Sequence, residues 1–209
     1  MDSDIIIIYA VAIIGIIMIF LTRFVAKGRS RDMTRLWFIT FFAFMVYYIL
    51  AKSYGYYEDT RDIVYAFGLL WPIAGILAFW IAELITRKGA QIAFIKWMVY
   101  FVVGIAFAFV LDGVAGIFQL YKYSQDVLVD KTWLVNPIGG LQVPSLMLLL
   151  PGILMLVVFF LVFNVYKLLR KRRIDDTSAT LLLSALSIVV VGFLWEASIL
   201  IVSFIKSMM

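Results

Sequence analysis

Apolar residues fill six long blocks of this chain, and polar or charged residues gather in the short stretches between them. A helix of about 20 apolar residues crosses the ~30 Å hydrocarbon core of a bilayer. The pattern therefore predicts an all-α integral membrane protein, a bundle of six transmembrane helices that forms one domain over residues 1–209. The expected spans are residues 4–21, 36–51, 63–86, 91–116, 142–166 and 178–205.

Turn-forming residues and prolines add detail to these spans. A short Arg-Lys-Gly-Ala turn at residues 87–90 joins the third span to the fourth, and residues 117–141 form the longest connection. Pro72 lies within the third span, and the pair Pro151 and Gly152 lies within the fifth. A proline inside a helix removes a backbone hydrogen bond, so each site predicts a kink with freed carbonyl groups.

The basic residues lie mainly on one side of the predicted bundle. The first, third and fifth connections, with the boundary residue Lys96, carry 13 of the 18 Lys and Arg residues and only three acidic ones. The connections on the other side carry five basic residues against seven acidic ones. Cytoplasmic loops are enriched in Lys and Arg. We therefore predict a multi-pass protein of the cell membrane with both termini on the outer side.

The composition excludes several kinds of chemistry. Apolar residues make up 65% of the 209 residues and charged residues 15%, whereas soluble domains have about half and a quarter. The chain contains no Cys and no His. This removes iron–sulfur clusters, structural zinc, His-ligated haem, and nucleophile systems that need Cys or His. We predict no metal site and no cofactor.

The net charge of +5 does not indicate a nucleic-acid partner, because the basic residues lie in connections beside the spans. The densest basic run follows the fifth span and consists of Arg170, Lys171, Arg172 and Arg173. Each cation near an anionic membrane surface contributes about 1 kcal/mol of attraction. Membrane lipids with anionic head groups are therefore the expected partners, although the run also serves as a topology signal. The sequence leaves open whether other membrane subunits join the protein.

Three acidic residues fall within or at the edge of the predicted spans: Glu83, Asp112 and Glu196. An ionised carboxylate at the centre of a span costs about 2.5–3.5 kcal/mol on insertion scales. Such side chains therefore normally face the interior of a helix bundle. Each of the three lies on a helical stripe of mostly small residues, which lets a neighbouring helix approach. We expect all three side chains to point inward.

Depth along the spans separates the three acids. Glu83 lies one turn from the inner end of the third span, and Lys96 lies at a matching depth in the fourth. An antiparallel hairpin brings these two side chains together, so we predict a structural ion pair. Asp112 lies near the outer end of the fourth span, and Glu196 lies in the outer half of the sixth. We expect these two to face one outward-opening cavity.

Lys52, Tyr48 and Tyr121 are further candidates for this cavity, because they lie at the outer end of the second span or in the outer connection. With Asp112 and Glu196 they form the predicted substrate- or ion-binding set, and no catalytic residue is assigned. Paired carboxylates within a membrane can exchange a proton or bind a cation, as in transporters. We therefore predict transport or channel-like passage, or a membrane subunit of a larger complex.

Two other interpretations remain open at this stage. The same carboxylates could protonate and deprotonate a double bond of an isoprenoid-like lipid by acid/base catalysis. They could also be purely structural hydrogen-bond partners that fix the register of neighbouring helices.

Overall fold

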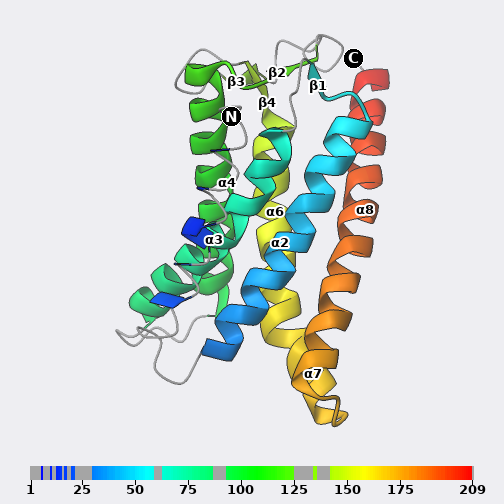
Figure 1. The fold of residues 1–209 in the computed structure, drawn as a ribbon. Helices are drawn as coiled ribbons and strands as arrows, with labels where there is room; N and C mark the ends of the chain where they lie inside the picture. Colours follow the sequence, from blue (N-terminus) through cyan, green and yellow to red (C-terminus); the bar gives the residue numbers. More distant parts are fainter. Residues whose placement is uncertain are drawn as a thin grey trace.

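The computed structural model of the protein describes residues 30–58, 63–86, 93–124, 134–135 and 142–208, and isolated positions at 6, 10, 13–15, 17, 20 and 21. Within these ranges the chain is mostly helical (Figure 1). The long helices are α2 (Ser30–Ser53), α3 (Ile63–Thr86), α4 (Ala93–Phe118), a continuous helix made of α6 (Ser145–Phe160), the π-helical turn η2 (Leu161–Val165) and α7 (Tyr166–Lys171), and α8 (Asp176–Met208).

Five helices of the described residues are long and apolar enough to cross a membrane. They match the second to sixth predicted spans, so the prediction of a multi-span helical membrane protein is confirmed in this coarser form. The predicted first span, residues 4–21, falls largely outside the described residues. In α2 the helix begins at Ser30 rather than at residue 36. The added turn is stable because buried Arg35 pairs with Asp32 at 2.9 Å and lies 3.2 Å above the ring of Tyr166.

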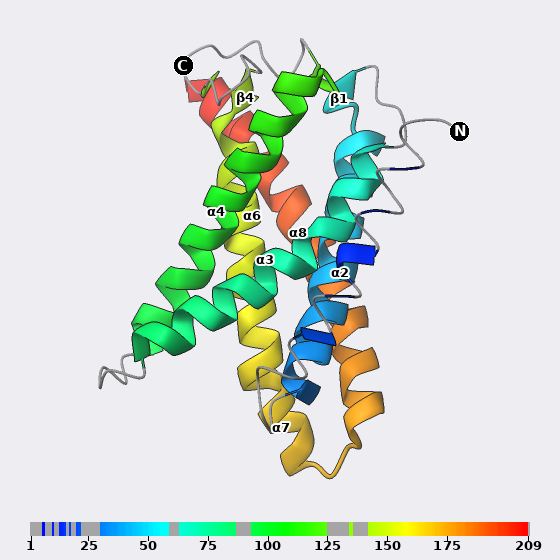
Figure 2. The same cartoon turned by 60° about the vertical axis from the view of Figure 1, so that its left-hand side comes forward.

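Successive helices run in opposite directions, so the bundle has two ends (Figure 1). We call the end with the C-terminus and the short strands the capped end, and the end with the α7–α8 turn the basic end. Helix α2 packs against both α3 and α8, while α4 packs against α6. Helices α3 and α4 lean away from α7 toward the end where α3 finishes and α4 begins (Figure 2).

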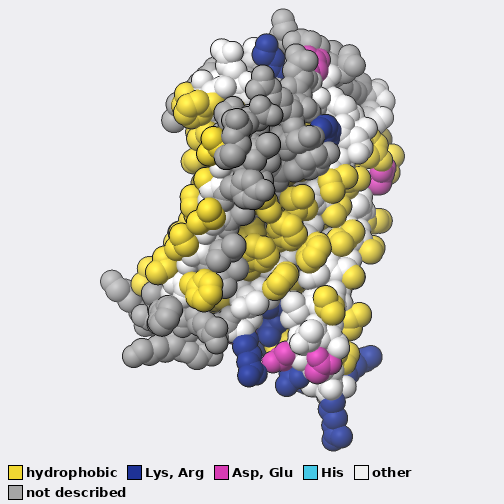
Figure 3. Space-filling view, viewed as in Figure 1, with side chains coloured by type: hydrophobic (Ala, Val, Ile, Leu, Met, Phe, Trp, Pro, Cys, Tyr) yellow, Lys and Arg dark blue, Asp and Glu magenta, His cyan; other side chains and the backbone are white. Residues whose placement is uncertain are grey.

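Side chains on the surface are distributed as in a membrane-spanning bundle. Figure 3 shows apolar side chains across the middle of the described surface and Lys and Arg side chains gathered at the basic end. Many of the large apolar residues that are exposed lie on α8, including Val189, Phe193 and Leu200. Exposed apolar surface of this extent is the surface that lipid covers in a membrane protein.

Helices α4 and α6 approach backbone to backbone at two glycines. A Cβ atom on Gly104 would lie 2.8 Å from Gly152 Cα and 2.9 Å from the carbonyl oxygen of Pro151. A Cβ atom on Gly152 would lie 2.8 Å from Cγ1 of Ile105. Contacts this short exceed what side chains tolerate, so the helices cross here only because both residues are Gly. The expected kink residues Pro151 and Gly152 thus take part directly in helix packing.

Helices α2 and α4 end in the same way at the capped end. The residue after each last turn has a positive φ, 70° at Gly55 and 53° at Gln119. The next N–H group then donates back to a carbonyl oxygen of the last turn at 2.9 Å, which is the Schellman arrangement. Both chain segments therefore turn sharply and fold back across the helix ends.

Two short antiparallel ladders lie at the capped end, and the first of them follows from these turns. Strand β1 (Tyr57–Glu58) pairs with β2 (Lys122–Tyr123), with Tyr57 opposite Tyr123. Strand β3 (Leu134–Val135) pairs with β4 (Val143–Pro144). We call residues 54–58 and 121–124 the cap, because they cover the end of the bundle where the candidate site lies. From the sequence, residues 54–58 and 121–124 are expected only to be connections between spans.

Candidate functional site

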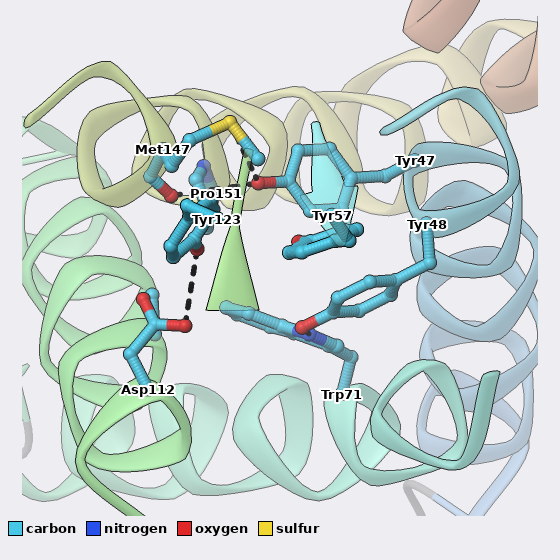
Figure 4. Close-up of a pocket in the computed structure, with 9 residues that line it drawn as sticks. Tyr47, Tyr48, Tyr57, Trp71, Asp112, Tyr123, Met147 and Pro151 are labelled. Carbon is cyan, nitrogen blue, oxygen red and sulfur yellow. Dashed lines mark hydrogen bonds between the residues drawn. The ribbon is translucent and has the colours of Figure 1, made fainter. Parts of the chain in front are cut away.

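Side chains from four helices and the cap line a small pocket near the capped end (Figure 4). The pocket has room for about one water molecule. The lining residues are Tyr47 and Tyr48 of α2, Tyr57 and Tyr123 of the cap, Trp71 of α3, Ala108 and Asp112 of α4, and Met147 and Pro151 of α6. Asp112 is the one carboxylic acid among them.

Asp112 is buried, with 5% of its surface exposed. Its oxygen Oδ1 accepts hydrogen bonds from the hydroxyl groups of Tyr121 and Tyr123, the latter at 3.1 Å. In the described ranges no Lys or Arg side chain forms an ion pair with this carboxyl group. The Schellman turn at Gln119 explains the geometry, because it folds residues 121–124 back over the end of α4. Asp112 is therefore hydrogen-bonded but has no basic partner among the residues that the structure describes.

The tyrosines of the cap are held in their protonated form. Burial raises the pKa of Tyr57, Tyr121 and Tyr123 well above the ordinary value. Their hydroxyl groups consequently remain donors at neutral pH, and those of Tyr121 and Tyr123 can keep donating to Asp112. The cap therefore supplies neutral dipoles to the carboxyl group rather than charges.

Aromatic contacts fix the other walls of the pocket. The Trp71 ring stacks on Phe44 with ring centroids 3.8 Å apart, and its Nε1–H donates to the Tyr48 hydroxyl at 3.2 Å. The Tyr47 hydroxyl donates to the carbonyl oxygen of Met147 at 3.4 Å. Tyr57 packs against Tyr123 at 5.2 Å between ring centroids. These contacts leave aromatic faces and hydroxyl groups around a single acid (Figure 4).

Glu196 does not reach this pocket, which corrects the prediction that both acids face one cavity. The side chain is exposed on α8 and accepts a hydrogen bond from the Tyr54 hydroxyl. The inward face of α8 is occupied instead by Val191, Trp195 and Ser198, all buried. Glu196 follows Trp195 by one residue, a rotation of about 100° around the helix. The bulk of Trp195 therefore turns Glu196 away from the interior.

Of the other residues predicted for the binding set, two lie at the pocket and one does not. Tyr48 lines the pocket and Tyr121 donates a hydrogen bond to Asp112, whereas Lys52 is partly buried at the end of α2 and is not among the lining residues.

The predicted pair of Glu83 and Lys96 lies apart from the pocket. Lys96 Nζ lies 3.2 Å from Glu83 Oε1, with both side chains partly exposed. That is the geometry expected from the hairpin. A partly exposed pair of this kind contributes about 0–1 kcal/mol to stability.

Sequence reasoning missed most of the aromatic wall: Tyr47, Tyr57, Trp71, Tyr123, and with them Met147 and Pro151. A signal was present, because tyrosines occur in pairs or near pairs at residues 47–48, 56–57 and 121–123. Aromatic residues at the ends of spans are usually explained as interfacial anchors. Here, however, Tyr47, Tyr57 and Tyr123 point into the bundle and line the pocket.

The site offers one carboxyl group, several hydroxyl groups and aromatic faces. No group of three or more Asp or Glu side chains in the described part of the chain could hold a metal ion. No family model matches the sequence, and no curated protein or solved structure is significantly similar to it. The geometry of the pocket is therefore the observation that indicates a function.

Proposed function

We propose that this multi-pass membrane protein binds a small monovalent cation at Asp112 and carries it across the membrane. The observation that carries the proposal is a buried carboxyl group without a basic partner in the described ranges, facing a small pocket. A carboxylate at this depth is costly unless its charge is compensated. The tyrosine hydroxyl groups supply part of that compensation, and a bound cation or a proton supplies the rest.

The walls of the pocket favour a particular class of cation. Rings of Trp and Tyr attract cations through their π faces, most strongly when water is excluded. The room for about one water molecule suits an ion of similar size, such as ammonium or potassium. Sodium holds its hydration shell more firmly and gains less from aromatic faces. We therefore expect ammonium and potassium to be preferred over sodium and over tetramethylammonium.

Two prolines next to the pocket support transport rather than static binding. Pro151 lines the pocket within α6, and Pro72 follows the lining residue Trp71 within α3. A proline inside a helix removes one backbone hydrogen bond, and in transporters the carbonyl groups freed in this way help to coordinate ions and permit movement. The pocket thus lies between two spans that can bend.

The test is a flux assay on the full-length protein in proteoliposomes. Ammonium, potassium, sodium and tetramethylammonium are imposed one at a time as gradients, and uptake is followed with empty liposomes as the reference. We expect protein-dependent uptake of ammonium or potassium. Binding of these ions without any flux would favour a membrane subunit of a larger complex. The absence of both binding and flux would rule the proposal out.

A second candidate function is favoured by the hydrogen bonds of Asp112. When protonated, a carboxyl group that accepts hydrogen bonds from Tyr121 and Tyr123 inside an aromatic pocket could donate its own proton to a double bond. Aromatic faces would stabilise the resulting carbocation through cation–π attraction. An isoprenoid-like lipid is the substrate class with this chemistry. Mass spectrometry of a lipid extract of the purified protein would detect such a lipid, and its absence would count against this alternative.

The basic end is the proposed contact with anionic lipid head groups. Arg170, Lys171, Arg172 and Arg173 are exposed there, and Arg170 alone among them pairs with an acid, Asp176 at 3.4 Å, in the described residues. We expect phosphatidylglycerol added to the protein in detergent to raise the thermal unfolding temperature. Changing residues 171–173 to Gln should remove most of that shift.

The matched control for this lipid experiment is Lys122→Gln at the capped end, where a basic side chain is also exposed. That variant should keep the full shift. An equal loss in both variants would show that phosphatidylglycerol acts through general charge rather than through the basic run.

The orientation remains part of the proposal, with six crossings, the basic end in the cytoplasm and both termini outside. Because the chain has no Cys, a single introduced Cys reports on one position. We expect Lys122→Cys to react with a membrane-impermeant maleimide in intact cells and Arg173→Cys to react only after permeabilisation. The reverse pattern would invert the topology.

A further inference from the structure

The cap that closes the pocket is held from two directions. On one side β1 pairs with β2, and Ser124 N–H donates to the carbonyl oxygen of Tyr56 at 2.9 Å. On the other side lies α8, which contributes no residue to the pocket lining. The role of α8 at this end is therefore not explained by cation binding.

Trp195 of α8 fits beneath the first segment of the cap. Only 1% of its surface is exposed, and its ring lies 5.0 Å from Tyr56 and 6.1 Å from Tyr54 between centroids. The same ring contacts the pocket residue Tyr47 at 5.6 Å. The contacts with Tyr56 and Tyr47 are edge-to-face, an arrangement that aromatic rings favour. Trp195 thus joins the cap, α2 and α8 at one point.

Glu196 holds the same segment from outside. Its carboxylate accepts a hydrogen bond from the hydroxyl group of Tyr54, the residue that begins the turn from α2 into β1. This hydrogen bond raises the pKa of Tyr54, so the hydroxyl group stays protonated and keeps donating. Three residues further along the chain, Tyr57 covers the pocket. The geometry therefore connects Glu196 to the pocket through the backbone of residues 54–57.

We infer that Glu196 and Trp195 are positioning residues that hold Tyr57 over the Asp112 pocket, so that α8 controls access to the pocket from the capped end. The inference deepens the proposed function, because it concerns the same site. It also explains why the acidic residue Glu196 lies on a lipid-exposed helix at the edge of the bundle. The partner of Glu196 is Tyr54 of the cap rather than Asp112.

The placement of α8 suits this role. Of the five candidate spans it has the smallest buried share, and its main packing partner is α2. A helix with one principal neighbour can shift without breaking the contacts between α3, α4 and α6 that build the rest of the pocket. Displacement of α8 would withdraw support from residues 54–56 and leave β2 as the remaining anchor of the cap.

Hydrogen exchange of the cap tests the inference on the full-length protein without added cation. Tyr54→Phe and Glu196→Ala each remove one partner of the hydrogen bond. We expect exchange of amides in residues 56–58 and 122–124 to become about three- to tenfold faster in each variant. The double variant should be no faster than either single variant, because both changes break one interaction.

Two variants serve as matched controls. Glu196→Gln keeps an acceptor oxygen and should restore slow exchange. Tyr56→Phe removes a hydroxyl group from the same turn, one that makes no hydrogen bond among the described residues, and should leave exchange unchanged. Unaltered exchange in Tyr54→Phe and Glu196→Ala would overturn the inference. Additive effects in the double variant would do the same.

A second measurement separates this inference from the proposed function. Rubidium, a probe for potassium, should dissociate faster from Tyr54→Phe than from the unaltered protein, while the thermal unfolding temperature stays the same. Absence of rubidium binding in every variant would reject the cation function. The exchange result would still decide whether α8 holds the cap.

Discussion

Asp112→Asn should lower the affinity for ammonium or potassium by about 100-fold or more and abolish flux in proteoliposomes. The reason is the loss of the one carboxylate that lines the pocket. Removing one member of a buried charge pair costs about 3–5 kcal/mol, and each 1.4 kcal/mol corresponds to about tenfold in affinity. Isothermal titration of the purified protein with each ion measures the change.

The same variant should remain folded. Asn keeps a side-chain oxygen that can accept the hydrogen bonds from Tyr121 and Tyr123. It also removes a buried acid that has no basic partner in the described ranges, so the unfolding free energy without cation should not fall. Glu196→Gln is the control, because it makes the same chemical change at an exposed acid that retains its acceptor oxygen. Normal binding by Asp112→Asn would show that the pocket is not a cation site.

Gly104→Ala should lower the free energy of unfolding by about 1–3 kcal/mol, the usual cost of overpacking. The new methyl group would meet Gly152 Cα at 2.8 Å and the Pro151 carbonyl oxygen at 2.9 Å, both backbone atoms that cannot rotate aside. Helices α4 and α6 would have to separate. Because Pro151 lines the pocket, cation affinity should fall together with stability.

Gly192→Ala is the matched control on α8. Nothing lies within 4 Å of a Cβ atom at Gly192, so the substitution should gain up to about 1 kcal/mol from helix propensity. Unfolding in increasing concentrations of SDS compares the two variants. Equal stability of the two would mean that the α4–α6 contact is looser than the structure shows.

The spans could be predicted from sequence because hydrocarbon imposes a simple requirement. Every backbone N–H and carbonyl group within the membrane must be bonded inside its own segment, which forces long apolar helices. The pair Glu83–Lys96 could also be predicted, because a short turn between antiparallel helices places residues at matching depth close together. In both cases the constraint acts within one helix or between two helices joined by a short turn.

The rotation of α8 could not be predicted in the same way. Its stripe of small residues suggested that Glu196 faces inward, whereas the buried face is set by Trp195 and its neighbours. A lipid-exposed helix can bury either a large aromatic side chain or a small-residue stripe, and the sequence alone does not decide between them. For Asp112 the stripe of small residues predicted the inward orientation correctly, because α4 packs against both α3 and α6.

The cap was also beyond sequence reasoning. Strands of two residues have no periodicity to detect, and the partners Tyr57 and Tyr123 are far apart in the chain. What places them together is the pair of Schellman turns at Gly55 and Gln119, of which only the first carries the glycine that usually marks such a turn. The aromatic wall of the site consequently depends on backbone turns rather than on a motif.

The π-helical turn Leu161–Val165 allows one span to serve two neighbours. A π turn accommodates one more residue than an α-helical turn, so the side chains after it are offset by about 100° from their α-helical positions. Before the turn, Pro151 and Gly152 meet α4; after it, Tyr166 lies beneath Arg35 of α2 and donates to Asp176 of α8. A chain shortened by one residue within this turn would keep its hydropathy and would still be long enough to cross a bilayer. The Tyr166 side chain would then point in another direction, and its contacts with Arg35 and Asp176 at the basic end would be lost.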